Sequence, residues 1–282
     1  MNKLKVIKII RNICPPILID YLLPKILKTY FNFFPKKILQ KNKILKDKAK
    51  GKVGFLLATG PSINKLDLAI LKKYDCFSLS SFFFHKDLSI INPKYHFLAP
   101  YHEPLIIEDW INWIKLADKS LPKNTKIVLS IKDQKRVKDL GLLKNREIIY
   151  LYFSKFIEVN KLDITGPLPD MQTHPLMVLP FMIYMGYKEI YLLGCDANNL
   201  KNYGKKIENF YDQNLEVKKG SNLPWSFGII KELENNLSVF NQFKKYKELG
   251  DKLNIKIINL SEDSWLDFFE KENYKNLFEN KN

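Results

Sequence analysis

The chain has 282 residues, 46% of them hydrophobic, and its 46 Lys and Arg outnumber 30 Asp and Glu for a formal net charge of +16. The hydrophobic content excludes a disordered chain, and the length suits one large α/β domain or two small ones. No apolar run reaches the roughly 18 residues of a membrane-spanning helix, and no secretory signal pattern is evident. We therefore expect a cytoplasmic protein.

The first fifty residues carry most of the excess positive charge. In residues 1–50, 13 Lys and Arg stand against Asp20 and Asp47, and Ile, Leu, Phe and Tyr alternate with the basic residues. Basic amphipathic segments of this kind bind anionic membrane surfaces. We expect a helical arm that binds the inner face of the cytoplasmic membrane peripherally. Nucleic acid is an alternative partner that we disfavour. A simpler alternative is that the segment is a helical arm packed on the main domain and binds no partner.

A short apolar strand at 54–58 leads into a glycine turn. Thr59, Gly60, Pro61 and Ser62 follow it, and apolar residues at helical spacing come next. We expect a helix that starts at Pro61 or Ser62, with Ser62 capping its free N–H groups. A strand, glycine turn and helix N-terminus together can bind phosphate, and Gly60 would let a ligand approach the backbone. An ordinary strand-to-helix turn is the alternative.

Strands and helices alternate through the rest of the chain. We expect strands at 75–81, 95–99, 126–131, 148–153, 187–196 and 255–260, and helices at 106–117, 172–184 and, as one or two helices, 225–253. We expect residues 197–225 to form a long polar loop, typical of a lid. The pattern predicts an α/β, Rossmann-like, doubly wound and mostly parallel sheet over residues 51–270, followed by a tail at 271–282. Ser80, His102, Asp196 and Ser261 each follow a strand, so they should converge near Gly60.

Three cysteines, Cys14, Cys76 and Cys195, lack the spacing of a metal site. Cys76 and Cys195 lie in apolar runs, so we expect both to be buried thiols.

Three sequence blocks resemble the bacterial lipooligosaccharide sialyltransferases of glycosyltransferase family 42. The blocks are Ala58 to Ser62 with Leu66-Asp67, Gly186 to Asp196, and Asn259 to Ser261 with Ser264 to Leu266. The same blocks are similar to the MptE-like proteins (domain of unknown function 115), which include 6-hydroxymethylpterin pyrophosphokinase and proteins of surface-polysaccharide loci. The resemblance spans roughly residues 52–270.

The resemblance implies a nucleotide site whose residues can be placed in this sequence. Ser80 takes the position of an Asn, His102 replaces a nucleotide-contacting Asn, and Gln172-Thr173-His174 stands for a Thr-Ser-Gly that contacts base and ribose. The implied nucleotide-binding residues are Thr59, Gly60, Pro61, Ser62, Ser80, Gln172, Thr173, Gly194 and Tyr203.

The relatives carry a catalytic His in the lid, whereas residues 197–225 contain none. An inverting transfer needs a base near the acceptor hydroxyl. Asp196 and His174 are the first candidates and His102 follows, with Glu208 and Asp212 also available. Tyr203, Tyr211, Lys201, Lys205 and Lys206 could stabilise the leaving phosphate. No Asp-x-Asp motif follows a strand, which favours a metal-independent reaction without any required cofactor.

Three functions stay open. The first is a glycosyltransferase that uses a nucleotide-activated sugar, a CMP-linked nonulosonate by resemblance, and a glycan or lipid-linked acceptor in surface-polysaccharide synthesis. The second is an MptE-like pyrophosphokinase, which would need Mg²⁺ held by carboxylates. The third is an inactive nucleotide-binding accessory protein.

Overall fold

The computed structural model describes residues 36–103, 105–155, 157–160, 162–205, 208–212, 225 and 228–279. Over these residues nine strands form one sheet in the order β6-β5-β4-β3-β2-β1-β7-β8-β9. Each neighbouring pair of strands is parallel. The strands are β1 (Val53–Leu57), β2 (Asp75–Leu79), β3 (Tyr95–Phe97), β4 (Lys126–Ser130), β5 (Ile148–Ser154), β6 (Pro167–Pro169), β7 (Glu189–Leu193), β8 (Lys256–Asn259) and β9 (Glu270–Lys271). The expected doubly wound α/β fold is confirmed.

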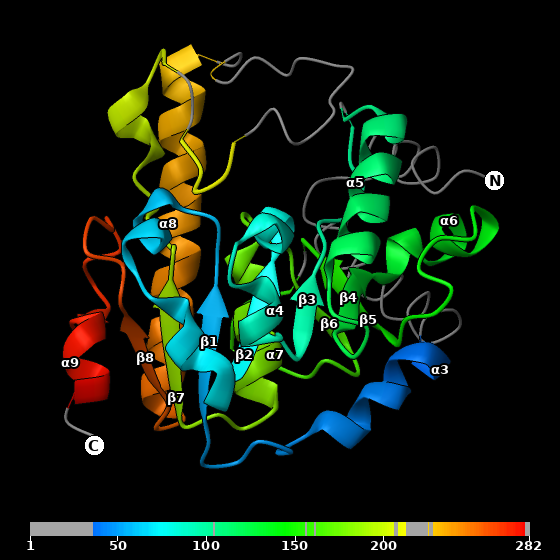
Figure 1. The fold of residues 1–282 in the computed structure, drawn as a ribbon, viewed down its shortest axis with the longest axis horizontal. Coiled ribbons are helices and arrows are strands. Elements are labelled where there is room, and N and C mark those ends of the chain that lie inside the picture. The colour runs from blue at the N-terminus through cyan, green and yellow to red at the C-terminus, as the bar shows by residue number, and fades with distance from the viewer. Residues whose placement is uncertain are drawn as a thin grey trace, which may run out of the picture.

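Helices cover both faces of the sheet (Figure 1). α7 (Pro175–Tyr184) and α8 (Gly228–Lys252) belong to the core on one face. The opposite core takes in α4 (Leu88–Ile91), α5 (Ile107–Ser120), α6 (Gln134–Asp139) and α9 (Tyr274–Glu279). α3 (Lys36–Leu39) precedes the sheet, and short 3₁₀ helices lie at Gln40–Leu45, Pro61–Lys65, Leu68–Lys73, Ser80–Phe84, Ile131–Asp133 and Asn199–Asn202.

The central strand β1 shows why the sheet needs a core on each side. Phe55 and Leu57 point into the core that also contains α5 and α9, whereas Leu56 and Ala58 point into the core that contains α7 and α8. This alternation follows from the two-residue repeat of a strand, and burial on both faces explains the nearly unbroken apolar run.

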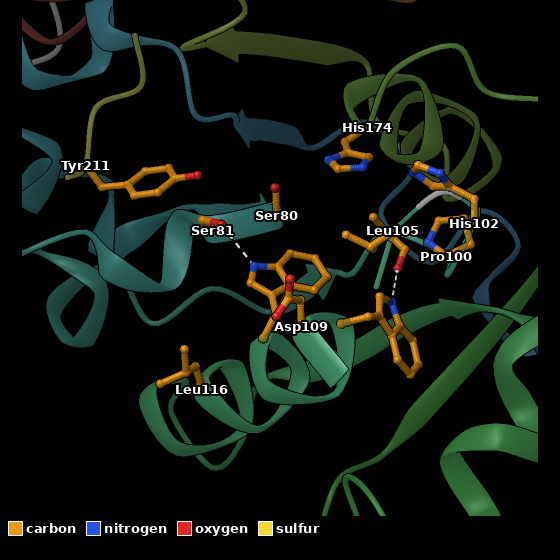
Figure 2. A pocket seen from close by; sticks show the side chains of 12 residues that line it. Ser80, Ser81, Pro100, His102, Leu105, Asp109, Leu116, His174 and Tyr211 are labelled. Atoms are coloured by element: carbon orange, nitrogen blue, oxygen red, sulfur yellow. Dashed lines mark hydrogen bonds between the residues drawn. The ribbon is translucent and has the colours of Figure 1, made fainter. Parts of the chain in front are cut away.

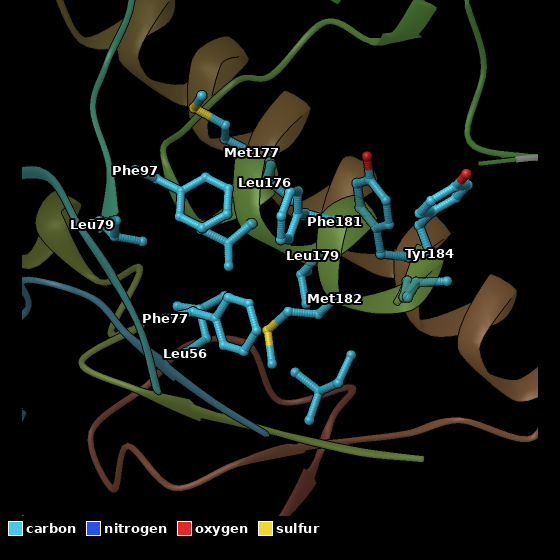
Figure 3. Packing of buried hydrophobic residues seen from close by; sticks show 14 of the residues in the cluster. Leu56, Phe77, Leu79, Phe97, Leu176, Met177, Leu179, Phe181, Met182 and Tyr184 are labelled. Atoms are coloured by element: carbon cyan, nitrogen blue, oxygen red, sulfur yellow. The ribbon is translucent and has the colours of Figure 1, made fainter. Parts of the chain in front are cut away.

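α7 is apolar on every side because it is enclosed. Each of its residues from Leu176 to Tyr184 is buried, and Phe181 packs edge-on against Phe77 and Phe97 (Figure 3). Pro175 stands in the first turn as expected, where no helical hydrogen bond needs its missing N–H. The helix carries Pro180 in its interior.

The expected helix after Gly60 is wrong. Two short 3₁₀ helices, Pro61–Lys65 and Leu68–Lys73, replace it, and Leu66 between them is extended. The Ser62 side chain caps no N–H group, since its hydroxyl donates to Asp196 instead. By contrast, α8 is one unbroken helix of 25 residues.

The C-terminal segment packs onto the main body. Tyr274 is 5% exposed, and its hydroxyl donates to the Asp67 carbonyl oxygen at 2.6 Å. Phe278 stacks near Phe55, so α9 covers the β1 side of the core.

The described part of the basic N-terminal segment also packs on the body. Leu39 and Leu45 are buried, and the Asn42 side chain donates to the carbonyl oxygens of Tyr150 and Ile164, at 2.9 Å each. Residues 1–35, with most of the expected membrane arm, lie outside the described residues. In the described part of the chain, no helix is long and apolar enough to cross a bilayer.

Cys76 and Cys195 are buried and unpaired, as expected. Burial raises the pKa of both thiols. Cys14 lies outside the described residues.

Candidate functional site

The order of the strands identifies one point of the sheet as the place for a ligand. The strands that follow β1 in sequence, β2 to β6, extend to one side of it, and β7 to β9 extend to the other. Doubly wound sheets bind ligands where this reversal occurs, outside the carboxyl ends of the strands. In this chain Ala58 to Gly60 and Gly194 to Asp196 meet at that point.

The two loops are held in direct contact. The Gly60 N–H donates to the Gly194 carbonyl oxygen at 2.9 Å. A β-carbon built on Gly60 would lie 2.5 Å from that oxygen and 2.6 Å from the Asp196 carboxyl carbon. The glycine is therefore required by a contact within the protein, rather than by an approach of ligand to its α-carbon.

Asp196 binds the turn that was expected to bind phosphate. Its Oδ2 accepts from the Ser62 N–H at 3.0 Å, and its Oδ1 accepts from the Ser62 hydroxyl. The Asp196 side chain is buried. The Asp196 carboxylate thus binds the N–H group at the start of the Pro61–Lys65 turn that was expected to bind a phosphate.

The third sequence block supports this arrangement. Ser261 Oγ accepts from the Cys195 N–H at 3.1 Å, and Ser264 Oγ donates to the Cys195 carbonyl oxygen at 2.8 Å. The Trp265 N–H donates to the Asp196 carbonyl oxygen at 3.0 Å. These hydrogen bonds join the sequence block that ends at Asp196 to the block that contains Ser264.

A cavity of about 270 Å³ opens at the strand reversal. We call it the switch-point cavity. It brings together eight of the residues predicted from sequence, namely Thr59, Gly60, Pro61, Gln172, Thr173, His174, Gly194 and Asp196. Its walls also include polar residues of α8 and the lid that were not predicted, Asn199, Asn209, Asn235 and Asn236, and Glu208, which was predicted only as a possible base.

A second cavity of about 230 Å³ adjoins the first, and His174 lines both (Figure 2). We call it the aromatic cavity. Ser80 and His102, both predicted, lie in its wall with Trp110 and Trp113 of α5. The Trp110 and Trp113 indole N–H groups donate to the Ala99 carbonyl oxygen at 3.1 Å and to Ser81 Oγ at 3.0 Å.

His174 is the ionisable group common to the two cavities. It is the residue before the first turn of α7, and its side chain makes no capping bond there. Burial lowers the pKa of His174 to about 4, and the nearby charge of His102 acts in the same direction. The imidazole is therefore neutral at neutral pH and has a lone pair that can accept a proton.

Part of the lid lies over the site. The Phe210 N–H donates to the Thr59 carbonyl oxygen at 3.2 Å, and the Asn64 side chain donates to the Phe210 carbonyl oxygen at 2.9 Å. Tyr211 lines the aromatic cavity, on the side opposite His102 in Figure 2.

Several predicted residues line neither cavity, among them Asp212, which was predicted as a possible base. Ser62 is buried against Asp196, and Tyr203 is 39% exposed with its ring 5.2 Å from that of Trp225. Lys201 and Lys205 also stand apart from the two linings, and Lys206 lies outside the described residues. Among the described residues, no group of three or more His, Cys, Asp or Glu is placed to hold a metal ion.

Asp109, which is 6% exposed and lines the aromatic cavity, was not predicted from the sequence. An acidic residue in the first turn of a helix is usually a surface feature, so its position alone gives no signal. Trp110 and Trp113 do carry a signal, since two tryptophans three residues apart share one helix face. Asn235 and Asn236 are poor helix formers inside a long helix, which is a weaker signal.

No known family model matches the chain, and no curated protein does. Among solved structures, a mutant of the alpha-2,3/8-sialyltransferase CstII is similar to the chain, with 19% sequence identity and a TM-score of 0.43. That similarity covers 78% of this chain and 86% of the other.

Proposed function

We propose that the chain is a glycosyltransferase that moves a sugar from a nucleotide-activated donor to a hydroxyl group of a glycan or lipid-linked acceptor. The observation that carries the proposal is the pair of cavities that meet at His174. Each is smaller than the roughly 300 Å³ at which cavities for drug-sized ligands begin. Two small adjoining cavities suit a ligand with two parts, such as a nucleotide joined to a sugar.

The nucleotide is assigned to the switch-point cavity. Thr59, Gln172 and Thr173 offer hydroxyl and amide groups there, and Asn235 and Asn236 face them from α8. These neutral groups can bind a base and a ribose. The three blocks that resemble sialyltransferases favour a cytidine nucleotide in this place.

The transfer step follows from the position of His174. The acceptor oxygen bonds to the anomeric carbon while the bond from that carbon to the phosphate oxygen breaks. The hydroxyl proton passes to the imidazole of His174, and the bonding electrons leave with the nucleotide. The displacement inverts the anomeric centre and requires no metal ion.

Asp196 is assigned a positioning role. Both of its oxygens accept hydrogen bonds from Ser62, which fixes the Gly60 loop against the cavity. Asp196 as the catalytic base is the competing proposal. The acceptor is proposed to lie at the inner face of the cytoplasmic membrane, which residues 1–50 would bind through their positive charge.

Nucleotide binding is tested first, with the full chain. Thermal shifts are measured with CMP, CDP, UDP, GDP and ATP, with and without Mg²⁺, since a ligand that binds the folded state raises its apparent stability. We expect one nucleotide to raise the melting temperature without Mg²⁺. Stabilisation by ATP alone, and only with Mg²⁺, would instead support the pyrophosphokinase.

The base is tested with the donor of the nucleotide that binds, by following release of free nucleotide. We expect His174→Gln to lower turnover by roughly 10²–10⁴-fold while donor affinity stays within about threefold. Asp196→Asn should lower donor affinity and the melting temperature together. Loss of turnover in His102→Gln alone, with donor affinity intact, would instead make His102 the base. Full turnover in His174→Gln with loss of turnover alone in Asp196→Asn would make Asp196 the base. Binding without turnover in the wild type would support the accessory protein.

A further inference from the structure

One wall of the aromatic cavity is formed by the segment that follows β3. Ala99, Pro100, His102 and Leu105 of this segment line the cavity, and Figure 2 shows the last three together on one side of it. Tyr101 lies between these residues in the chain but contacts the protein behind the wall, at α5 and α6. The position of Tyr101 therefore determines where this wall of the cavity lies.

Three side chains hold Tyr101 from behind the wall. Its backbone N–H donates to Asp133 Oδ2 at 3.1 Å, and its ring centre lies 4.6 Å from the guanidinium carbon of Arg136. Trp110 of α5 packs edge-on against the same ring, with the ring centres 6.2 Å apart. Asp133 ends the 3₁₀ helix after β4 and Arg136 belongs to α6, so the wall is fastened to the elements that follow β4.

Asp133 is the group that joins these contacts. Its Oδ2 accepts from the Tyr101 N–H while its Oδ1 accepts from the Arg136 guanidinium, so one carboxylate binds two donors at once. An amide cannot replace it, because an asparagine side chain has one acceptor oxygen and would turn its NH₂ group toward the other donor. The carboxylate thus couples the position of Tyr101 to that of Arg136.

The ionised form of Asp133 is costly to the fold. Its side chain is 1% exposed, and burial raises its pKa to about 6, although the hydrogen bond from Tyr101 and the charges of Arg136 and Lys132 act in the opposite direction. Burial and, after it, the charge of Asp133 raise the pKa of Tyr150 on β5. Packed apolar residues can often replace a buried ion pair without loss of stability, so stability alone does not account for this pair.

We infer that Asp133 and Arg136 are positioning residues for the sugar of the donor. They fix Tyr101 and, through it, one wall of the aromatic cavity. This inference rests on the proposed function, because it places the sugar of the donor in this cavity. Asp133 and Arg136 themselves line neither cavity. Their replacement should therefore weaken binding of the sugar part and leave binding of the nucleotide in the switch-point cavity unchanged.

The test measures both parts of the donor on the full chain by isothermal titration at neutral pH. CMP is compared with CMP-N-acetylneuraminate, CDP with CDP-glucose, UDP with UDP-glucose, and GDP with GDP-mannose. For the nucleotide that binds, the affinity for the donor is divided by the affinity for the bare nucleotide. This ratio reports the contribution of the sugar, and a general loss of folded structure would lower both affinities together.

Two variants and a control locate the effect. Asp133→Asn should lower the ratio about tenfold, which corresponds to one lost hydrogen bond, while the affinity for the bare nucleotide stays within about twofold. Arg136→Lys keeps the charge but loses the planar group beside the Tyr101 ring, and should lower the ratio about threefold. Asp139→Asn removes the same charge from an exposed ion pair with Lys135 on α6, and should change neither affinity.

A second measurement follows the hydrogen bond itself and needs no ligand. The full chain is labelled with ¹⁵N-tyrosine, and Tyr101→Phe identifies the Tyr101 amide signal among those of the 14 tyrosines. An ionised carboxylate is a stronger acceptor than a protonated one. We therefore expect the Tyr101 amide proton signal to move upfield as the pH is lowered, with a midpoint near pH 6, and to lose this titration in Asp133→Asn.

The outcomes separate this inference from the proposed function. If no nucleotide in the panel binds, the proposed function falls and the inference falls with it. If a nucleotide binds but Asp133→Asn leaves the ratio unchanged, or weakens the nucleotide and the donor equally, the inference alone is overturned. A wild-type Tyr101 amide that does not titrate also overturns it, because the Asp133 carboxylate would then not hold this wall.

Discussion

Replacement of Gly60 by alanine tests the clamp between the two loops of the site. Gly60 has φ −67° and ψ 150°, a conformation that any L-residue adopts and that suits a residue before proline. Backbone preference alone would therefore make alanine slightly stabilising, by about 0.4–1 kcal/mol. The added β-carbon, however, would lie 2.5 Å from the Gly194 oxygen and 2.6 Å from the Asp196 carboxyl group. The Gly194 oxygen belongs to the backbone, and the Asp196 carboxyl group is held in place by its two hydrogen bonds from Ser62.

The expected cost is worked from these contacts. Overpacking of this kind costs about 1–3 kcal/mol. Displacement of Asp196 also weakens its bonds from Ser62, and hydrogen bonds to charged groups are worth about 1.5–3 kcal/mol each. We expect Gly60→Ala to lower the free energy of unfolding by about 2–4 kcal/mol. The melting temperature should fall by roughly 3–7 °C for a chain of this size.

Urea unfolding followed by tryptophan fluorescence measures this change, and the dependence on urea should keep its slope. Gly166→Ala is the matched control, because its β-carbon would meet only the Asp163 oxygen, at an ordinary 3.5 Å. We expect Gly166→Ala to change stability by less than about 1 kcal/mol. A Gly60→Ala protein as stable as the wild type would refute the clamp, and Gly60 would then be free for direct contact with a ligand.

Two further predictions concern acid stability and the membrane. Burial lowers the pKa of His96 from 6.5 to about 3. As the pH falls below about 6.5, the unfolded chain therefore binds a proton at this imidazole while the folded chain does not. The free energy of unfolding then falls by up to roughly 1.4 kcal/mol per pH unit. In His96→Gln the free energy of unfolding, measured by urea titration at each pH, should fall less steeply between pH 6.5 and 5. An unchanged dependence on pH would contradict the assignment. Burial raises the pKa of Asp133 to about 6, which acts in the opposite direction in both proteins. Joint replacement of Lys3, Lys5 and Lys8 by Gln should lower the affinity for acidic liposomes, measured by sedimentation, roughly a hundredfold, because each basic residue contributes about 1 kcal/mol. Equal sedimentation of the wild type with neutral liposomes would refute an electrostatic attachment.

The sheet was predictable because its signal is strong. Buried parallel strands read as apolar runs, and Phe55 to Leu57 and Ile190 to Leu193 are such runs. β6 was missed because Pro167–Pro169 is short and contains two prolines, which usually exclude a strand except at an edge. β6 is indeed the outermost strand on its side of the sheet.

The site was predictable only in part. The residues after β1 and β7 converge at the carboxyl edge as the topology requires, so Gly60 and Asp196 could be grouped from the order of the strands, whereas His174 was placed there only by the resemblance. The helix after Gly60 was predicted from apolar spacing, which a 3₁₀ turn shares over so few residues. The bond between Ser62 and Asp196 joins residues 134 positions apart, and no local pattern reports it. Asp109 was missed because burial in a cavity wall depends on the packing of α5.

The separation between Ser62 and Asp196 sets the timing of assembly on the ribosome. β1 can pair with β2 soon after both emerge, but its other edge stays open until β7 has been made. At about 5–20 residues per second, translation of the intervening chain takes on the order of ten seconds. During that interval the nascent chain exposes an apolar strand edge, the kind of surface to which other chains add as a further strand. Whatever covers this edge during synthesis therefore affects the yield of folded molecules separately from the stability of the finished protein.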